Sequence, residues 1–226
     1  MKIFADGCTL EDVHKLKNNS IVEGYTFNPS LLRKAGVVDF EKFAKEVLSL
    51  TKLPVSFEVF SDNWDGAERE ARIMASWGEN VYIKIPPFFT TGIYISGLVE
   101  NLIKDNIKIN LTCIFTYHQI NNAIKLLGDR DGIISIFAGR ISDCGYNPEH
   151  FIAYAHYHKF PKQQILWAST RELSNIKQAE DSGADIITLG VDLINKLDLI
   201  GKDLFEFSKD TVRMFHEDAV KSGYKL

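Results

Sequence analysis

A lysine stands in the middle of the apolar stretch Val81–Pro86, which reads Val-Tyr-Ile-Lys-Ile-Pro. β-Branched and aromatic residues predict a buried strand here, and an apolar strand is a costly place for an ammonium group. Burial favours the neutral amine, a nucleophile that can form a Schiff base with a carbonyl compound. Pro86 and Pro87 end the strand just after Lys84, so the amine lies near a strand's carboxyl end, where α/β proteins keep their functional groups. The stretch alone also fits an edge strand whose lysine head group reaches water.

Polar residues stand in or just after most of the other apolar runs. Side chains alternate between the two faces of a strand, so Asn110 and Thr112 share one face, as do Ser135 and Phe137. A single polar residue in a strand is usually a hydrogen-bonded group without a further role, but a set at matched depth is typical of a site at the carboxyl ends of parallel strands. The candidates are Asp6, Thr26, Asn28, Glu58, Lys84, Asn110, Thr112, Ser135, Arg140, Ser169 and Arg171.

Short apolar runs alternate with amphipathic runs along the chain. The predicted strands are Lys2–Ala5, Val22–Thr26, Pro54–Phe60, Val81–Ile85, Ile107–Phe115, Gly132–Ala138, Gln164–Ser169 and Asp185–Leu189. Apolar residues at three- and four-residue spacing between them, such as Phe43 and Val47, predict helices. This alternation favours a single α/β domain over residues 1–226, a (β/α)8 TIM barrel. The alternative is a doubly wound open sheet, although the turn after the first strand lacks the glycine spacing of such folds.

Several helix boundaries carry their own signals. Asp39 and Asn147 are expected helix caps, as is Thr170 or Arg171 ahead of Glu172, and Gly183 is expected to close a helix. Residues 203–223 continue past the eighth strand with an apolar stripe and predict an additional C-terminal helix. That helix packs either on its own barrel or on a neighbouring subunit.

Composition and charge limit the kinds of molecule that this protein is expected to bind and the compartment that it fits. The chain has 226 residues, 45% of them hydrophobic, and a net charge of −4, which predicts a globular protein and argues against a nucleic-acid surface. Three cysteines without a Cys-x-x-Cys pair predict neither a disulfide framework nor a zinc site, and fit a reducing, cytoplasmic setting. We expect no signal peptide and no membrane span. His150, His156 and His158 lack the spacing of metal ligands on one helix face, so no metal is expected.

Five segments resemble motifs of the transaldolase family, and specifically of its short single-domain branch, which includes fructose-6-phosphate aldolases. Residues 26–30 read Thr-Phe-Asn-Pro-Ser and are similar to the family's Thr-x-Asn-Pro-Ser motif, and residues 83–86 resemble its Schiff-base strand. Residues 110–112 resemble its fifth-strand motif, 135–143 its sixth and 168–171 its seventh. The matches follow one another in the family's order over almost the whole chain.

The resemblance implies a Schiff-base transferase of the pentose phosphate pathway that moves a dihydroxyacetone unit between sugar phosphates without a metal or an organic cofactor. Lys84 is the implied nucleophile, and Asp6 would take and return the proton of the C4 hydroxyl. Glu58 would transfer protons during imine formation through a water held by Thr112.

The resemblance also implies binding residues and an assembly. The residues around the dihydroxyacetone unit would be Thr26, Asn28, Asn110, Ser135 and Phe137. Arg140, Ser169 and Arg171 would bind the phosphate, because guanidinium groups bind it bidentately. The short branch implies a homo-oligomer, a pentamer or a decamer.

Two alternatives stay open. A fructose-6-phosphate aldolase would release free dihydroxyacetone, and that branch resembles this chain except that it carries glutamine in place of Glu58 and tyrosine in place of Phe137; both differences favour transaldolase. The second alternative is a non-catalytic barrel that binds a sugar phosphate. The chain also departs from the family pattern at Gly7, where a hydroxyl residue is usual, and in the bulky segment 86–92.

Overall fold

Eight parallel strands pair in chain order, and the last pairs with the first to close a barrel. The computed structural model describes residues 1–225. The strands are β1 (Lys2–Asp6), β2 (Val22–Thr26), β3 (Val55–Glu58), β4 (Val81–Ile85), β5 (Ile109–Ile114), β6 (Gly132–Ile136), β7 (Gln163–Trp167) and β8 (Ile186–Gly190). The predicted (β/α)8 barrel is therefore confirmed, and the doubly wound sheet is wrong.

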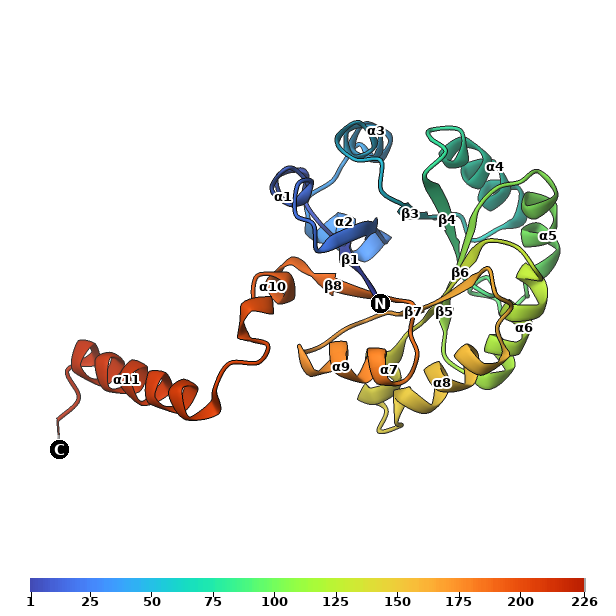
Figure 1. The fold of residues 1–226 in the computed structure, drawn as a ribbon. Helices are drawn as coiled ribbons and strands as arrows, with labels where there is room; N and C mark the ends of the chain where they lie inside the picture. The colour runs from blue at the N-terminus through green and yellow to red at the C-terminus, as the bar shows by residue number, and fades with distance from the viewer. Residues whose placement is uncertain (226) are drawn as a thin grey trace. The chain divides into compact units, whose positions relative to one another are not determined.

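Helices lie around the outside of the strands (Figure 1). They are α1 (Leu10–Leu16), α2 (Pro29–Lys34), α3 (Phe40–Leu50), α4 (Trp64–Ala75), α5 (Ser96–Lys104), α6 (Tyr117–Leu127), α7 (Ala138–Asp143), α8 (Pro148–His158), α9 (Ser174–Asp181) and α10 (Val191–Ile194). Each long helix buries one apolar stripe, and the strands pack against these stripes from within. Phe27, just after β2, shows the contact: its ring lies 5.3 Å from that of Phe43 in α3 and 5.5 Å from that of Phe57 in β3.

The predicted N-terminal helix caps are confirmed at two positions and wrong at a third, and the predicted closing glycine is confirmed as well. Asp39 and Asn147 accept hydrogen bonds from the backbone of the first turns of α3 and α8, and Gly183 follows α9 with a φ of 87°. Helix α9, however, begins only at Ser174. Thr170 instead donates a 2.6 Å hydrogen bond from its hydroxyl to the carbonyl of Thr188, which holds this segment at the barrel mouth.

Several strands end earlier than predicted, because the chain turns outward at the mouth. The seventh strand ends at Trp167, and Ser169 adopts a positive φ of 66°, a conformation that no strand contains. The sixth ends at Ile136, and Phe137 already precedes α7. The apolar residues that suggested longer strands belong to these turns. They are still largely buried there, although the strand pairing has ended.

The barrel interior has an apolar lower part and a polar upper part. Phe4, Tyr82, Ile133, Leu166 and Ile186 belong to one buried cluster. Positions two residues further along a strand share the same face, and four of these residues are followed there by a polar side chain: Asp6, Lys84, Ser135 and Thr188. The apolar cluster therefore packs beneath the polar groups of the barrel mouth.

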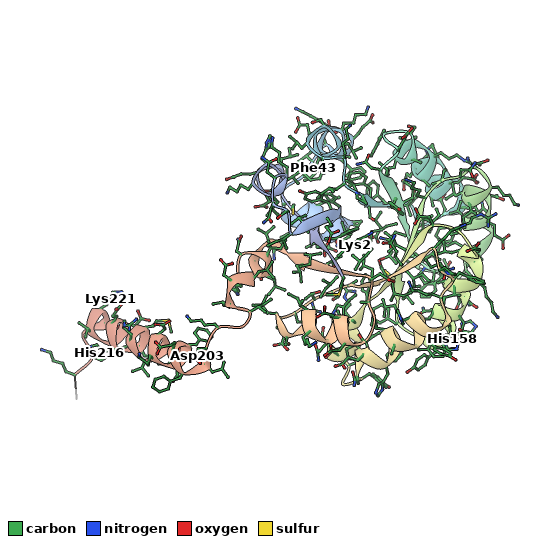
Figure 2. The ribbon with its side chains drawn as sticks, viewed as in Figure 1. Lys2, Phe43, His158, Asp203, His216 and Lys221 are labelled. Atoms are coloured by element: carbon green, nitrogen blue, oxygen red, sulfur yellow. The ribbon has the colours of Figure 1, made fainter. Side chains whose placement is uncertain are left out.

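A second compact unit comprises Asn195–Leu226 and contains the short 3-10 helix η1 (Leu197–Leu199) and helix α11 (Leu204–Ser222). Asp203 caps the start of α11, and Lys221 lies in its last turn (Figure 2). The predicted C-terminal helix is thus present, while the extent of the barrel domain and the partner of the apolar stripe stay predictions. Within the described part of the chain, no helix is long and apolar enough to cross a bilayer.

Candidate active site

Strand register brings three of the predicted residues into one row. Lys84 of β4 pairs with Glu58 of β3 on one side and with Asn110 of β5 on the other. Paired residues of neighbouring parallel strands point to the same face, and Asn110 is fully buried while Lys84 is 6% exposed. Glu58, Lys84 and Asn110 therefore face the barrel interior together, near the carboxyl ends of their strands.

Lys84 and Glu58 form a close ionisable pair. Lys84 Nζ lies 3.5 Å from Glu58 Oε2, and both side chains are largely shielded from solvent. Burial raises the pKa of the Glu58 carboxyl above its ordinary value, although the nearby charge of Lys84 opposes the shift. A carboxyl with a raised pKa beside an amine can exchange protons with that amine or with its adducts.

Asp6 is the last residue of β1, the strand that pairs with β2 and β8. Its Oδ1 accepts a 2.7 Å hydrogen bond from the Thr26 hydroxyl. Burial raises the pKa of the Asp6 carboxyl, while Lys84 and the Thr26 hydrogen bond oppose the rise. Gly7 follows with a φ of 66°, and a Cβ at that position would lie 2.7 Å from Leu31 Cδ1. Any larger residue at position 7 would have a strained backbone and would clash with Leu31. The hydroxyl beside the Asp6 carboxylate is instead that of Thr26.

Asn110 belongs to a buried hydrogen-bond chain that crosses three strands. Its Nδ2 donates to Ser56 Oγ over 3.0 Å, and its Oδ1 accepts from the Ser135 hydroxyl over 2.7 Å. Ser135 is 1% exposed and Ser56 is fully buried. The amide orientation of Asn110 is therefore defined from both sides.

Thr112 and Asn28 use their polar groups differently. Thr112 Oγ1 is buried without a hydrogen-bond partner among the described residues. Such a group usually binds a water or a ligand. Asn28 Oδ1 instead caps α2 by accepting from the backbone N–H of Leu31, so its Nδ2 is the group left to donate to a ligand.

A pocket of about 300 Å³ opens at this end of the barrel. Nine of the predicted residues line it: Asp6, Thr26, Asn28, Lys84, Ser135, Phe137, Arg140, Ser169 and Arg171. Glu58 and Asn110 do not line the pocket themselves. Glu58 contacts Lys84, and Asn110 contacts Ser135. One pocket thus collects an amine, the carboxyl groups of Asp6 and Asp192, and two guanidinium groups.

The basic groups of the pocket, Arg140 and Arg171, follow β6 and β7. The Arg140 guanidinium lies 5.4 Å from the centre of the Phe137 ring, which holds it at the mouth. Arg171 NH2 lies 2.5 Å from Asp143 Oδ2, and this ion pair orients Arg171. Together with the Ser169 hydroxyl, these groups can bind a phosphate or another doubly charged anion.

Sequence reasoning missed several residues that build this pocket. Gly139, in the first turn of α7, lies so close to the next loop that a Cβ would lie 1.7 Å from the carbonyl oxygen of Ser169. Ser56 supports Asn110 from inside the barrel. Further lining residues are Ser30, Leu31, Leu166, Ala168, Thr170, Thr188, Gly190, Asp192 and Leu193. Period-two alternation from Glu58 back to Ser56 could have identified the serine, whereas no local signal marks the close approach at Gly139.

Among residues 1–225, no group of three or more His, Cys, Asp or Glu side chains could hold a metal ion. The thiols of Cys8, Cys113 and Cys144 are free. Cys8 is buried, and burial raises its pKa to about 12.

Solved structures share the fold. N-acetylneuraminate lyase from Mycoplasma synoviae matches 94% of this chain and 75% of its own with a TM-score of 0.54 and 14% identity. Orotidine 5'-monophosphate decarboxylase from Metallosphaera sedula matches 96% of this chain and 99% of its own with a TM-score of 0.54 and 15% identity. At such identities the likeness concerns the barrel architecture alone.

Sequence relatives are closer. A protein of Bartonella tribocorum named "Probable transaldolase" is 35% identical over 84% of this chain and 85% of its own. A protein of Bartonella bacilliformis with the same name is 34% identical and spans 100% of both chains, and "Probable transaldolase 2" of Listeria monocytogenes is 33% identical over 93% and 95%. Residues 3–226 match the family described as "Transaldolase/Fructose-6-phosphate aldolase". The chain belongs to the transaldolase/fructose-6-phosphate aldolase family.

Proposed function

We propose that this chain is a transaldolase, which transfers a dihydroxyacetone unit from a ketose phosphate to an aldose phosphate through a Schiff base on Lys84. The observation that carries the proposal is the buried Lys84 amine, which lies 3.5 Å from Glu58 and opens into a pocket with Asp6 and Arg140 on its walls. A binding protein has no need for a buried amine beside two carboxyls, since such an arrangement is costly to fold.

The proposed reaction uses each of these groups in a defined step. The neutral Lys84 amine adds to the C2 carbonyl of the ketose, and loss of water gives the imine, with Glu58 exchanging the protons. Thr112, whose buried hydroxyl has no protein partner among the described residues, would hold the water of this step. Asp6 then takes the C4 hydroxyl proton while the C3–C4 bond breaks, which leaves an enamine on Lys84 and frees an aldose phosphate. Addition of the enamine to a second aldose phosphate and hydrolysis of the imine complete the transfer.

The phosphate end of the donor would lie at Arg140, Ser169 and Arg171. Fructose 6-phosphate and sedoheptulose 7-phosphate are the proposed donors. The hydroxyls of the three-carbon unit would lie against Thr26, Asn28, Asn110 and Ser135, with Phe137 packing beside them. Nearly all of these residues share the pocket that contains Lys84, and Asn110 contacts it through Ser135.

Transfer rather than release is favoured by Glu58 and Phe137. The Phe137 ring packs 5.4 Å from the Phe115 ring and carries no acidic hydrogen. The aldolase branch is expected to have a tyrosine hydroxyl here, which could protonate the enamine and release dihydroxyacetone. Without that hydroxyl, the enamine persists until an aldehyde arrives.

The test supplies fructose 6-phosphate with and without a four-carbon aldose phosphate, and follows both the seven-carbon ketose phosphate and free dihydroxyacetone. We expect the seven-carbon product to form only with the acceptor, and little free dihydroxyacetone in either case. Lys84→Met, whose unbranched side chain is one atom shorter and lacks the amine, serves as the inactive control. Phe137→Tyr is expected to raise dihydroxyacetone release relative to transfer.

Acceptor-independent release of dihydroxyacetone by the wild-type protein would assign it to the aldolases instead. A third outcome is that the protein binds fructose 6-phosphate and sedoheptulose 7-phosphate and forms neither product from either of them. That result would favour the non-catalytic barrel. Assembly as a pentamer or decamer also remains our proposal, and light scattering of the 25.6 kDa chain measures it directly.

A further inference from the structure

Ser56 is a fully buried hydroxyl that takes no step in the proposed reaction. It lies on β3 two residues before Glu58, so its side chain points to the same interior face. Register pairs it with Thr26 on one side and with Tyr82 on the other. It is therefore placed between the Asp6–Thr26 pair and the row that contains Lys84.

The hydrogen bonds of Asn110 determine which atoms are donors. Asn110 Oδ1 can only accept, so the hydrogen in its 2.7 Å contact with Ser135 must come from the Ser135 hydroxyl. On the other side of the amide, Nδ2 donates to Ser56 Oγ over 3.0 Å. Ser135 has only one hydroxyl hydrogen, and it is used inside this chain. Toward the pocket, Ser135 therefore presents lone pairs alone.

We infer that Ser56 is a positioning residue that fixes the Asn110 amide and thereby makes Ser135 a hydrogen-bond acceptor for a hydroxyl of the bound three-carbon unit. The inference rests on the proposed function. It predicts that the pocket distinguishes a hydroxyl-bearing carbon from a methyl group at this point, because a methyl would leave the Ser135 lone pairs unpaired.

Removing the Ser56 hydroxyl would loosen this arrangement. With alanine at position 56, the amide loses its partner on that side in either orientation. A turned amide would donate to Ser135 and would release the Ser135 hydrogen toward the pocket. The Asn110 amide and the Ser135 hydroxyl would then populate more than one arrangement, so the hydrogen bond to a ligand hydroxyl would form only part of the time and the preference for that hydroxyl would weaken.

The experiment measures borohydride-trapped adducts on the intact protein with dihydroxyacetone and with hydroxyacetone, which has one hydroxyl fewer. The readout is the ratio of the half-saturating concentrations of the two ketones. We expect the wild-type protein to favour dihydroxyacetone by roughly tenfold, the equivalent of about one buried hydrogen bond. In Ser56→Ala this ratio should fall to about two or less.

Controls separate positioning from general damage. Ser182→Ala removes another buried hydroxyl, bonded to the backbone at the end of α9, and should leave the ratio unchanged. Ser56→Cys fills similar space but accepts weakly, so it should lower the ratio even if the alanine variant folds poorly. In a Ser135→Ala background, Ser56→Ala should cause no further loss, because the two residues act through one hydrogen-bond chain.

The outcomes distinguish this inference from the proposed function. An adduct on the wild-type protein with an unchanged ratio in Ser56→Ala and Ser56→Cys would overturn the role of Ser56 alone. Independent, additive effects of the Ser56 and Ser135 substitutions would overturn it as well. Absence of any adduct on the wild-type protein would overturn the proposed Schiff base and this inference with it.

Discussion

On the Lys84 side of the pocket the functional groups are parts of strands, whereas on the Arg140 side they lie past the strand ends. Lys84, Asn110 and Ser135 are buried within β4, β5 and β6. The Arg171 side chain is 49% exposed and is oriented by a single ion pair. Strand pairing and burial fix the first group of side chains to the geometry of the barrel. Bond-making chemistry requires such rigidity, while anion binding tolerates a looser, more solvated site.

After the loss of Lys84 itself, the largest effect is expected from Asp6→Asn on the strand side. The substitution keeps the Thr26 hydrogen bond but removes the proposed base. The turnover rate should fall by roughly a hundred- to ten-thousandfold, the usual contribution of general acid–base catalysis. The transfer assay measures it, with binding of the donor as the control. A variant that kept most of the wild-type rate would show that another group moves the proton.

On the loop side, Arg140→Ala should weaken binding of the phosphorylated donor by about 10- to 100-fold with little change in turnover. Arg171→Ala should cost only a few-fold, since Asp143 already neutralises part of the Arg171 charge. Steady-state KM values for both variants make this comparison. A larger effect at Arg171 than at Arg140 would reverse the assignment of the main phosphate ligand.

Gly139→Ala tests how far the loop side depends on the close contact between the backbones of Gly139 and Ser169. Its Cβ would lie 1.7 Å from the Ser169 carbonyl oxygen, so the Ser169–Arg171 segment must shift. We expect about 1–3 kcal/mol less stability, as in overpacked cores, together with a raised KM and a nearly normal yield of borohydride adduct. Gly145→Ala is a control for backbone strain alone, because nothing lies within 4 Å of a Cβ there while its φ of 82° disfavours a side chain; it should lose some stability and keep a normal KM. Equal behaviour of the two variants would contradict the account of Gly139.

The smallest effect concerns stability, and it belongs to the strand side. The folded-state pKa of Asp6 is raised, so its contribution to folding is most favourable below the ordinary pKa of 3.8 and is lost as the pH rises through the folded-state value. Asp6→Asn should therefore melt at a higher temperature than the wild type at pH 7, and the difference should narrow as the pH falls. A difference that widened on acidification would show that the ionised carboxylate stabilises the fold.

The same contrast explains how much could be predicted from the sequence. The barrel follows from eight apolar runs, and period-two alternation correctly places Asn110 and Thr112 on one face, because strand geometry is local. The nine predicted residues that line the pocket lie in or just after five of the strands, and their motifs are short and local as well.

What could not be predicted depends on contacts between distant segments. The positive φ of Ser169 and the approach of Gly139 arise only when two loops meet at the mouth, so the end of the seventh strand and the start of the helix after it were predicted wrongly. The hydrogen-bond chain through Ser56 likewise requires the pairing of separate strands. Polar residues at strand ends could be identified, and alternation could also have pointed to Ser56, whereas the contacts between these residues could not be predicted.

The central claim, that Lys84 is the nucleophile, is tested most directly by borohydride trapping with a natural type of donor. The protein is incubated with fructose 6-phosphate and reduced, and its peptides are mapped by mass spectrometry, with Lys84→Met in parallel. We predict a three-carbon, dihydroxyacetone-derived adduct on the peptide that contains Lys84, and none in the variant. An adduct on a different lysine, or no adduct with either fructose 6-phosphate or sedoheptulose 7-phosphate, would contradict the claim.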